Sequence, residues 1–173
     1  MDFREKTLES NLIYEGKILS LKKDKVLLPN GESSYREIVL HNGGSTVVAE
    51  KDGKILLVSQ FRYAYKEQIW EIPAGKIDKG ETPDKTAIRE LEEECGYRAG
   101  RVELLFEVYP TPGYTSEKIY IYRAHDLVKT QTHFDDDENL TSKWFTKEEL
   151  VDMISNGVIK DGKTLIALLS VLK

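Results

Sequence analysis

A short helix with a stop signal at each end is the feature that most constrains how this chain folds. Thr82 and Pro83 are typical of a helix N-cap and first turn, and Gly96 is a natural C-cap. Between them, apolar residues recur on one face at positions 87, 88, 91 and 95. The pattern predicts one helix of about thirteen residues with a single buried face.

The same helix carries a stripe of carboxylates beside its apolar face. At about 100° per residue, Glu90, Glu93 and Glu94 fall within an arc of about 100°. Like charges one turn apart cost a helix roughly 0.2–0.5 kcal/mol per pair. A bound Mg²⁺ offsets that cost, because hard cations take oxygen ligands and leave positions open for substrate phosphates. For an arbitrary glutamate-rich helix, a solvated acidic face is the commoner explanation.

The spacing around the helix decides between these explanations. Gly75 is followed after five residues by Glu81, and after seven more by residues 89–96, which read RELEEECG. This segment resembles the Nudix box at all of its fixed positions, and a chance match is on the order of 10⁻⁸ per starting position. Tyr97 departs from the aliphatic residue usual after the box, at a position expected to pack. Gly75 and Gly80 bracket a loop that must bend sharply before the helix.

The resemblance implies roles for the box residues. In Nudix hydrolases, the glutamates that match Glu90 and Glu94 ligate Mg²⁺, and the backbone carbonyl that matches Ala74 adds a ligand. The glutamate that matches Glu93 assists catalysis, and Arg89, one turn earlier, is expected to hold it by a charge-assisted bond. Family substrates are nucleoside diphosphates linked to another group, and metal-assisted water attacks a phosphorus atom. Mn²⁺ is an alternative ion.

A second acidic stretch, residues 135–138, reads DDDE. In the ADP-ribose pyrophosphatase branch of the family, a glutamate well beyond the box adds a metal contact. An acid two residues earlier orients or deprotonates the attacking water. Glu138 and Asp136 match these residues. Because branch members often carry Glu in place of Asp136, the general base stays open among Asp136, Glu138 and Glu93.

Features outside the box bear on the substrate. Residues 111–117 read TPGYTSE and resemble the proline signature of ADP-ribose pyrophosphatases, with Thr111 in place of the usual serine. The segments QFR, ending at Arg62, and WEIPAG, residues 70–75, also resemble this branch, in which the matching arginine contacts the diphosphate. The substrate-binding set implied for this part of the chain is Arg62, Lys76, Thr111, Pro112, Gly113 and Glu117.

Residues 1–42 are expected to form a small antiparallel sheet before a Nudix domain at 43–173. Strand signals at 17–21, 25–28 and 35–40 are separated by turn residues. The segment YREIV resembles one whose Arg and Glu approach adenosine. It therefore implies contacts from Arg36 and Glu37, with Ile18 and His41 as weaker matches. About forty residues cannot build a core alone, and in this branch the segment packs on a second subunit. A homodimer that shares its sites is expected.

The rest of the chain predicts an α+β fold, the Nudix α/β/α sandwich. Asp52-Gly53 is a strong hairpin signal. A capping box at Thr146 and an N-cap at Asp161 open two further helices. Further strands are expected at 45–50, 55–60, 69–72, 102–109 and 118–124.

Charge and cysteine usage exclude several classes of protein. The net charge is -5, from 25 basic and 30 acidic residues, and it argues against nucleic-acid or anionic-membrane partners. Residues 75–97 and 135–138 account for this charge, because the remainder holds 19 acids and 21 bases. The single cysteine, Cys95, cannot form an internal disulfide and is expected to be a buried packing residue. The charged start MDFREK lacks a following apolar segment, so a cytoplasmic protein is expected.

These features together predict a Mg²⁺-dependent Nudix pyrophosphatase that cleaves ADP-ribose to AMP and ribose 5-phosphate. One alternative keeps the chemistry but changes the substrate to another nucleotide sugar, of the ADP-glucose or GDP-mannose type. Another is a non-catalytic Nudix fold that binds a ligand as a regulator. The complete set of box carboxylates argues against this last alternative.

Overall fold

The computed structural model describes residues 2–134 and 139–172, which form two compact units. The first unit combines the residues up to Gly43 with the later segment Tyr109–Lys118. The second combines Gly44–Val108 with the residues from Ile119 onward. The sequence pattern indicates a boundary near residue 42 but does not reveal the return of Tyr109–Lys118.

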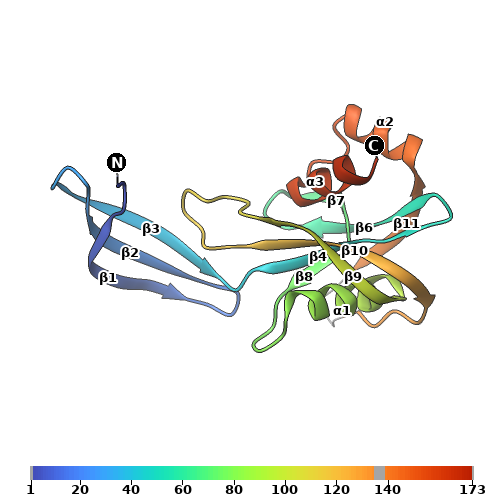
Figure 1. The fold of residues 1–173 in the computed structure, drawn as a ribbon, viewed down its shortest axis with the longest axis horizontal. Helices are drawn as coiled ribbons and strands as arrows, with labels where there is room; N and C mark the ends of the chain where they lie inside the picture. The colour runs from blue at the N-terminus through green and yellow to red at the C-terminus, as the bar shows by residue number, and fades with distance from the viewer. Residues whose placement is uncertain (1, 135–138, 173) are drawn as a thin grey trace. The chain divides into compact units, whose positions relative to one another are not determined.

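The first unit is a three-stranded antiparallel sheet in the order β1-β2-β3 (Figure 1). Its strands are β1 (Lys6–Glu15), β2 (Leu19–Leu27) and β3 (Ser33–His41). The two short strands expected at 17–21 and 25–28 are one continuous strand. The sequence pattern also fails to predict β1. All ten residues of this strand are exposed, so the segment lacks the alternation of apolar and polar residues that marks a half-buried strand.

Backbone hydrogen bonds attach the returning segment Tyr109–Lys118 to β3. The amide of Val39 donates to the carbonyl of Tyr114 at 2.7 Å, and the amide of Ser116 donates to the carbonyl of Val39 at 2.9 Å. The segment therefore extends the edge of this sheet over a short distance.

The second unit contains a mixed sheet, an antiparallel sheet and three helices (Figure 1). One sheet has the order β8-β4-β10-β9, with strands Ala74–Lys76, Gly44–Val48, Ile119–Lys129 and Tyr97–Val108. The other has the order β11-β6-β5, with β7 also paired to β6, and its strands are Leu140–Thr146, Lys54–Arg62, Glu50–Lys51 and Glu67–Glu71. The helices are α1 (Pro83–Cys95), α2 (Lys147–Ser155) and α3 (Gly162–Val171). With α1 on one side of the sheets and α2 and α3 on the other, the predicted α+β sandwich is confirmed.

Each face of the central strands packs against a different helical layer. Val47 of β4 belongs to the core beneath α1, with Leu91 and Cys95, whereas its neighbour Val48 packs in the core beneath α2 and α3, with Leu168. Successive side chains of a strand point to opposite faces, so a strand covered on both sides is apolar without interruption. This explains the run Ile55–Val58 in β6, and it fixes α1 against the sheet.

The local signals for turns and caps are confirmed. Helix α1 has the expected thirteen residues and ends at Gly96 in the left-handed conformation, at φ 65°. Thr146 and Glu149 form the expected capping box of α2, and Asp161 accepts a capping bond at the start of α3. Thr82 begins α1 in an extended conformation, but its side chain makes no capping bond.

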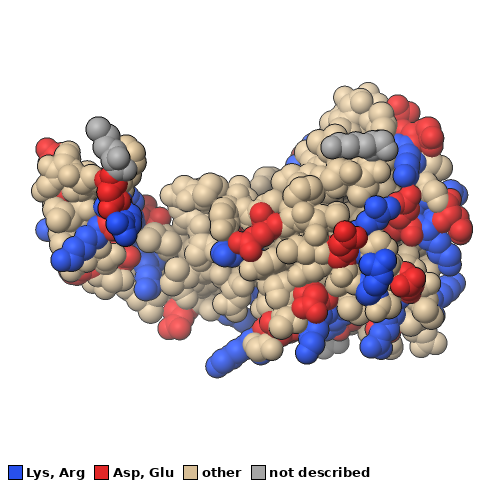
Figure 2. Space-filling model, in the orientation of Figure 1, with Lys and Arg blue, Asp and Glu red and all other residues tan. Residues whose placement is uncertain are grey.

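Two further observations concern the surface and the helix lengths. On the face that Figure 2 shows, acidic and basic side chains are interspersed over the second unit. A mixed surface of this kind does not produce the single-sign field of a polyanion-binding face.

Among the helices of the described residues, none has the length and apolar character that would be needed to cross a bilayer.

Candidate active site

The candidate site lies where strand β8 faces helix α1. Strand β4 holds this backbone in place, with Thr46 paired to Ala74 in antiparallel register. Just before β8, the carbonyl of Pro73 accepts from Thr46 Oγ1 at 2.8 Å and from the amide of Val47 at 3.0 Å. Strand β4 is also bonded to the helix, because Ser45 Oγ donates to the carbonyl of Pro83, in the first turn of α1, at 2.7 Å. The segment that carries the Ala74 carbonyl is therefore fixed relative to the helix.

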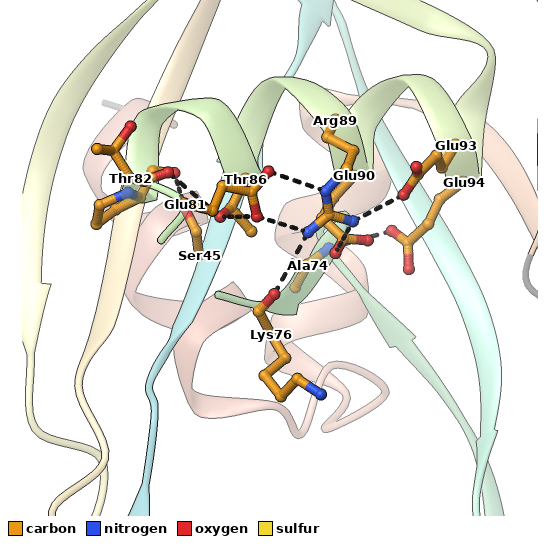
Figure 3. A network of polar contacts seen from close by, with 11 residues as sticks. Ser45, Ala74, Lys76, Glu81, Thr82, Thr86, Arg89, Glu90, Glu93 and Glu94 are labelled. Atoms are coloured by element: carbon orange, nitrogen blue, oxygen red, sulfur yellow. Dashed lines mark hydrogen bonds and ion pairs between the residues drawn. The ribbon is translucent and has the colours of Figure 1, made fainter. Parts of the chain in front are cut away.

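Two carboxylates of α1 are buried against this strand. Glu90 is 7% exposed and Glu94 is 3% exposed. Glu94 Oε2 accepts a hydrogen bond from the amide of Ala74 at 3.1 Å. Figure 3 shows both side chains directed from the helix toward the β8 backbone. The structure thus brings together Glu90, Glu94 and Ala74, the three metal-binding residues expected from the box.

Gly75 allows the close approach of Glu90. A Cβ atom at this position would overlap the Glu90 carboxylate. Gly75 does not adopt a positive φ, whereas Gly80 does, at 86°. Within the loop that the two glycines bracket, Gly80 therefore supplies the left-handed residue. At Gly75 the missing side chain makes room for a carboxylate.

Arg89 connects three carboxylates around the start of the site (Figure 3). Its Nε and Nη2 atoms each donate to Glu81 at 3.0 Å, to Oε1 and Oε2 respectively. Its Nη1 atom donates to Glu90 Oε1 at 2.7 Å and to Glu93 Oε2 at 2.8 Å. The expected bond to Glu93 is confirmed, and the bonds to Glu81 and Glu90 are additional. A single guanidinium therefore fixes the orientation of both Glu90 and Glu93.

Glu81 is a structural acid in this network. The hydrogen bonds from Arg89 lower the pKa of Glu81 from 4.5 to about 2, against the opposing effect of burial, and Thr86 adds a further hydrogen bond. Thr86 Oγ1 lies 2.7 Å from Glu81 Oε2. The same contact with Glu81 raises the pKa of Arg89 above its ordinary value. Glu81 is ionised at neutral pH and ties the loop before α1 to the helix.

The donor set suits a hard divalent cation. Glu81, Glu90 and Glu93 together carry three negative charges against the single positive charge of Arg89. Carboxylate and backbone carbonyl oxygens are the ligands that Mg²⁺ prefers. Within residues 2–134 and 139–172, no group of three acidic, histidine or cysteine side chains is placed so that it could hold a metal ion by itself. The described residues supply two carboxylates and the Ala74 carbonyl, and Asp136 and Glu138 lie outside the described residues.

Arg62 reaches the neighbourhood of this site from the end of β6. Its Nε atom donates to Glu71 Oε1 at 2.5 Å, and its Nη2 atom donates to Glu71 Oε2 at 2.8 Å. The bonds to Glu71 raise the pKa of Arg62, and Glu94 is among the charges that contribute to the same shift. Arg62 therefore lies within electrostatic reach of a box carboxylate. It also lines a cavity of about 420 Å³.

Lys76 contributes to the network through its backbone. Its carbonyl accepts a hydrogen bond from Arg89 Nη2 at 3.4 Å. Its side chain extends away from the guanidinium in Figure 3. The structure therefore places the backbone of Lys76 in the carboxylate network and its ammonium group outside it.

The first unit holds the other expected substrate-binding residues, in two groups. On β3, Arg36 is bound by Glu5, an ion pair that sequence reasoning missed, and also donates to the Tyr35 carbonyl at 2.9 Å. His41 Nδ1 lies 3.5 Å from Glu117 Oε1. Four of the expected residues are exposed, namely Ile18, Glu37, Pro112 and Gly113. The Thr111 carbonyl accepts hydrogen bonds from the amides of Tyr114 and Thr115.

Sequence reasoning gave no role to Glu71 or Lys163. Glu71 is 3% exposed and accepts hydrogen bonds from both Arg62 and Lys163. The position of Glu71 within WEIPAG is a local signal, but Lys163 lies 92 residues further along the chain. No local pattern links a lysine in the first turn of a helix to such a distant strand.

Comparisons with known proteins agree with this arrangement. A model of the Nudix domain matches residues 40–168, and a model of the nucleoside diphosphate sugar hydrolase N-terminal domain matches residues 5–39. A methanol dehydrogenase activator from Bacillus methanolicus is 42% identical over 168 residues, which cover 95% of this chain and 91% of that protein. An ADP-ribose pyrophosphatase from Bacillus subtilis (strain 168) is 40% identical, with 95% and 90% covered. A protein of the same name from Mycobacterium tuberculosis is 32% identical, with 95% and 82% covered.

A solved structure supports the fold. The crystal structure of an ADP compounds hydrolase superposes with a TM-score of 0.88 and covers 98% of this chain and 93% of that chain. At 21% sequence identity, this likeness bears on the fold alone. The domain match, the relatives and the box geometry agree, and the chain belongs to the Nudix family of hydrolases.

Proposed function

We propose that this Nudix hydrolase cleaves ADP-ribose to AMP and ribose 5-phosphate with Mg²⁺ as its cofactor and Mn²⁺ as an alternative. The observation that carries the proposal is the burial of Glu90 and Glu94 against the Ala74–Lys76 strand. Relatives named ADP-ribose pyrophosphatase support the choice of substrate. We propose the cytoplasm as its location, from cysteine usage, and neither nucleic acid nor membrane as a partner.

In this proposal, Glu90, Glu94 and the Ala74 carbonyl hold the metal, and Glu138 adds a ligand. The bound cation would neutralise charge on the diphosphate and lower the pKa of a water molecule. Arg89 keeps Glu90 in place by the 2.7 Å bond described above. The general base is one of Asp136, Glu138 and Glu93. Among these three, Glu93 lies within the described residues, where Arg89 orients its carboxylate.

The proposal assigns the substrate contacts to both units. In the second unit, Arg62 binds the diphosphate, because a planar guanidinium matches phosphate oxygens in a bidentate manner. Lys76 is a further substrate contact in this unit. In the first unit, Arg36 and Glu37 approach the adenosine. The proline-signature residues Thr111, Pro112, Gly113 and Glu117 are also proposed contacts, and Ile18 and His41 are the weaker ones.

A substrate panel tests the choice of ADP-ribose. Initial rates with ADP-ribose, ADP-glucose, GDP-mannose and NADH, each with Mg²⁺ and a coupled phosphatase that releases phosphate, give four values of kcat/KM. We expect the value for ADP-ribose to exceed the others by about tenfold or more, because contacts to the group beyond the diphosphate discriminate in the transition state. A clear preference for another nucleotide sugar would refute the specificity while leaving the Nudix chemistry intact.

A regulatory role is the second candidate, because one relative carries the name of a methanol dehydrogenase activator. A regulator that acts only by binding does not need the buried carboxylates of α1. Binding of all four substrates without turnover of any would favour such a role. Turnover of any of them at enzymatic rates would exclude a purely non-catalytic regulator.

The homodimer belongs to the same proposal. Val26 is the only buried apolar side chain in the described part of the first unit, and all ten residues of β1 are exposed. A three-stranded sheet with so little core is marginal by itself and gains stability from a covering surface. The exposed apolar residues that a second subunit would cover include Leu8, Leu12, Tyr14 and Tyr35. Sedimentation velocity should give twice the chain mass, and a stable, active monomer would contradict this expectation.

A further inference from the structure

A partly buried cluster of alternating charges joins helix α3 to the ends of β6 and β7. Glu71 lies at its centre and accepts from Arg62 at 2.5 and 2.8 Å. Lys163 Nζ donates to the same Glu71 Oε2 atom and lies 3.0 Å from Asp161 Oδ1. The Lys163 side chain is only 12% exposed. The order Arg62, Glu71, Lys163, Asp161 alternates cations with anions.

The first turn of α3 fixes the position of Lys163. Asp161 Oδ2 accepts from the Thr164 amide at 2.9 Å and from Thr164 Oγ1 at 2.6 Å. The same hydroxyl accepts from the amide of Ile72 at 2.9 Å. The turn is therefore bonded to the residue that follows Glu71, close to the start of β8. The backbone from which the Lys163 side chain extends is therefore held beside β7.

Strand pairing places Arg62 at the open side of the cluster. In the antiparallel pairing of β6 with β7, Arg62 lies opposite Glu67. Alternate residues of a strand share a face, so Glu67, Ile69 and Glu71 point to the same side of β7. Arg62 spans the distance from Glu67 to Glu71 with its side chain, which is 40% exposed. Its guanidinium therefore contacts a buried carboxylate while remaining accessible from the cavity.

Two cations contact the buried Glu71 carboxylate. A buried carboxylate costs several kcal/mol unless it is paired and hydrogen-bonded. Burial raises the pKa of Glu71, but the bonds from Arg62 and the charge of Lys163 outweigh it and keep the pKa below its ordinary value. Lys163 contacts both Glu71 and Asp161, so the two carboxylates share its positive charge. With Arg62 included, two positive charges face the two negative charges of Glu71 and Asp161.

We propose that Lys163 is a positioning residue that acts through Glu71 to keep the Arg62 guanidinium directed toward the substrate diphosphate. This inference rests on the proposed function, in which Arg62 binds that diphosphate. Without Lys163, both Glu71 and Asp161 lose a cation, and Arg62 is the nearest replacement. The guanidinium then turns toward Asp161 and away from the diphosphate.

Steady-state kinetics of K163M test the inference. We expect KM for ADP-ribose to rise about tenfold, the size of one weakened charge-assisted hydrogen bond, with kcat within about twofold of the wild type. The matched control is K160M, because Lys160 lines the same cavity but pairs with the exposed Glu67 at 2.7 Å. Its KM should stay within about twofold of the wild-type value. An unchanged KM in K163M would overturn the inference.

A Glu71→Gln background separates positioning from a general loss of structure. The neutral amide no longer attracts Arg62, so adding K163M to E71Q should change KM by about twofold or less. An equal KM increase in both backgrounds would contradict an action through Glu71.

Failure of the wild type to turn over ADP-ribose would refute the proposed function by itself. The crystal structure of K163M tests the position of Arg62 even in that case. Movement of Arg62 toward Asp161 supports positioning. An undisturbed bidentate contact with Glu71 overturns it.

Discussion

Replacing Glu94 with Gln should lower kcat/KM for Mg²⁺-dependent hydrolysis by about 100-fold or more, with little loss of folded protein. A metal ion supplies several kcal/mol of charge stabilisation in the transition state, and an uncharged amide is a much poorer ligand for it. The fold should persist because the Gln side chain has the same shape. Its carbonyl oxygen can still accept the 3.1 Å bond from the Ala74 amide. Initial rates over a Mg²⁺ titration, with a thermal melt of each variant, measure both effects.

Glu92→Gln is the matched control on the same helix. Glu92 lies 3.9 Å from Arg98 and takes no part in the Arg89 network. Its replacement removes the same charge from α1, so a general electrostatic effect would appear in both variants. We expect the control to retain activity within about twofold. Full Mg²⁺-dependent turnover by the Glu94 variant would show that the metal assignment is wrong.

Gly75→Ala should reduce activity about as strongly, through a steric effect. The new methyl group overlaps the Glu90 carboxylate, so Glu90 must leave the β8 backbone and its bond with Arg89. The obstructing atoms are the end of a flexible side chain, and we therefore expect a stability cost of only about 1–3 kcal/mol. Paired measurements of kcat/KM and of the unfolding midpoint should show a large kinetic loss in a protein that still folds.

Gly162→Ala controls for the substitution itself. Gly162 is the first residue of α3, and a Cβ there would meet no heavy atom within 4 Å. Alanine in a compatible helical position is neutral or stabilising by up to about 1 kcal/mol. Wild-type activity in the Gly75 variant would mean that the position of Glu90 against β8 has no role in catalysis.

Local signals account for what the sequence predicts well. Helix α1 follows from Thr82, Pro83 and Gly96, because caps and turn residues act on their nearest neighbours. The same holds for Thr146 in the capping box of α2. The resemblance to the Nudix box adds the grouping of Glu90 and Glu94, which the structure places together against β8.

Features that depend on distant partners are not predicted. Strand β1 forms by pairing with β2, and its own residues show no alternation of apolar and polar character. The contact of Lys163 with Glu71 joins residues 92 positions apart. The sequence shows that position 75 is a glycine, but not why. The structural reason is that a glycine leaves room for Glu90 where α1 closely approaches β8. The roles expected for Asp136 and Glu138 stay predictions.

Product chromatography tests the central claim most directly, namely that carboxylates of α1 and the β8 backbone hold a divalent cation for diphosphate hydrolysis. ADP-ribose is incubated with the wild-type protein, once with Mg²⁺ and once with EDTA, and the products are separated and quantified. We predict equal amounts of AMP and ribose 5-phosphate with Mg²⁺, and intact ADP-ribose with EDTA. AMP formation at the same rate in EDTA, or intact ADP-ribose in both samples, would contradict the account.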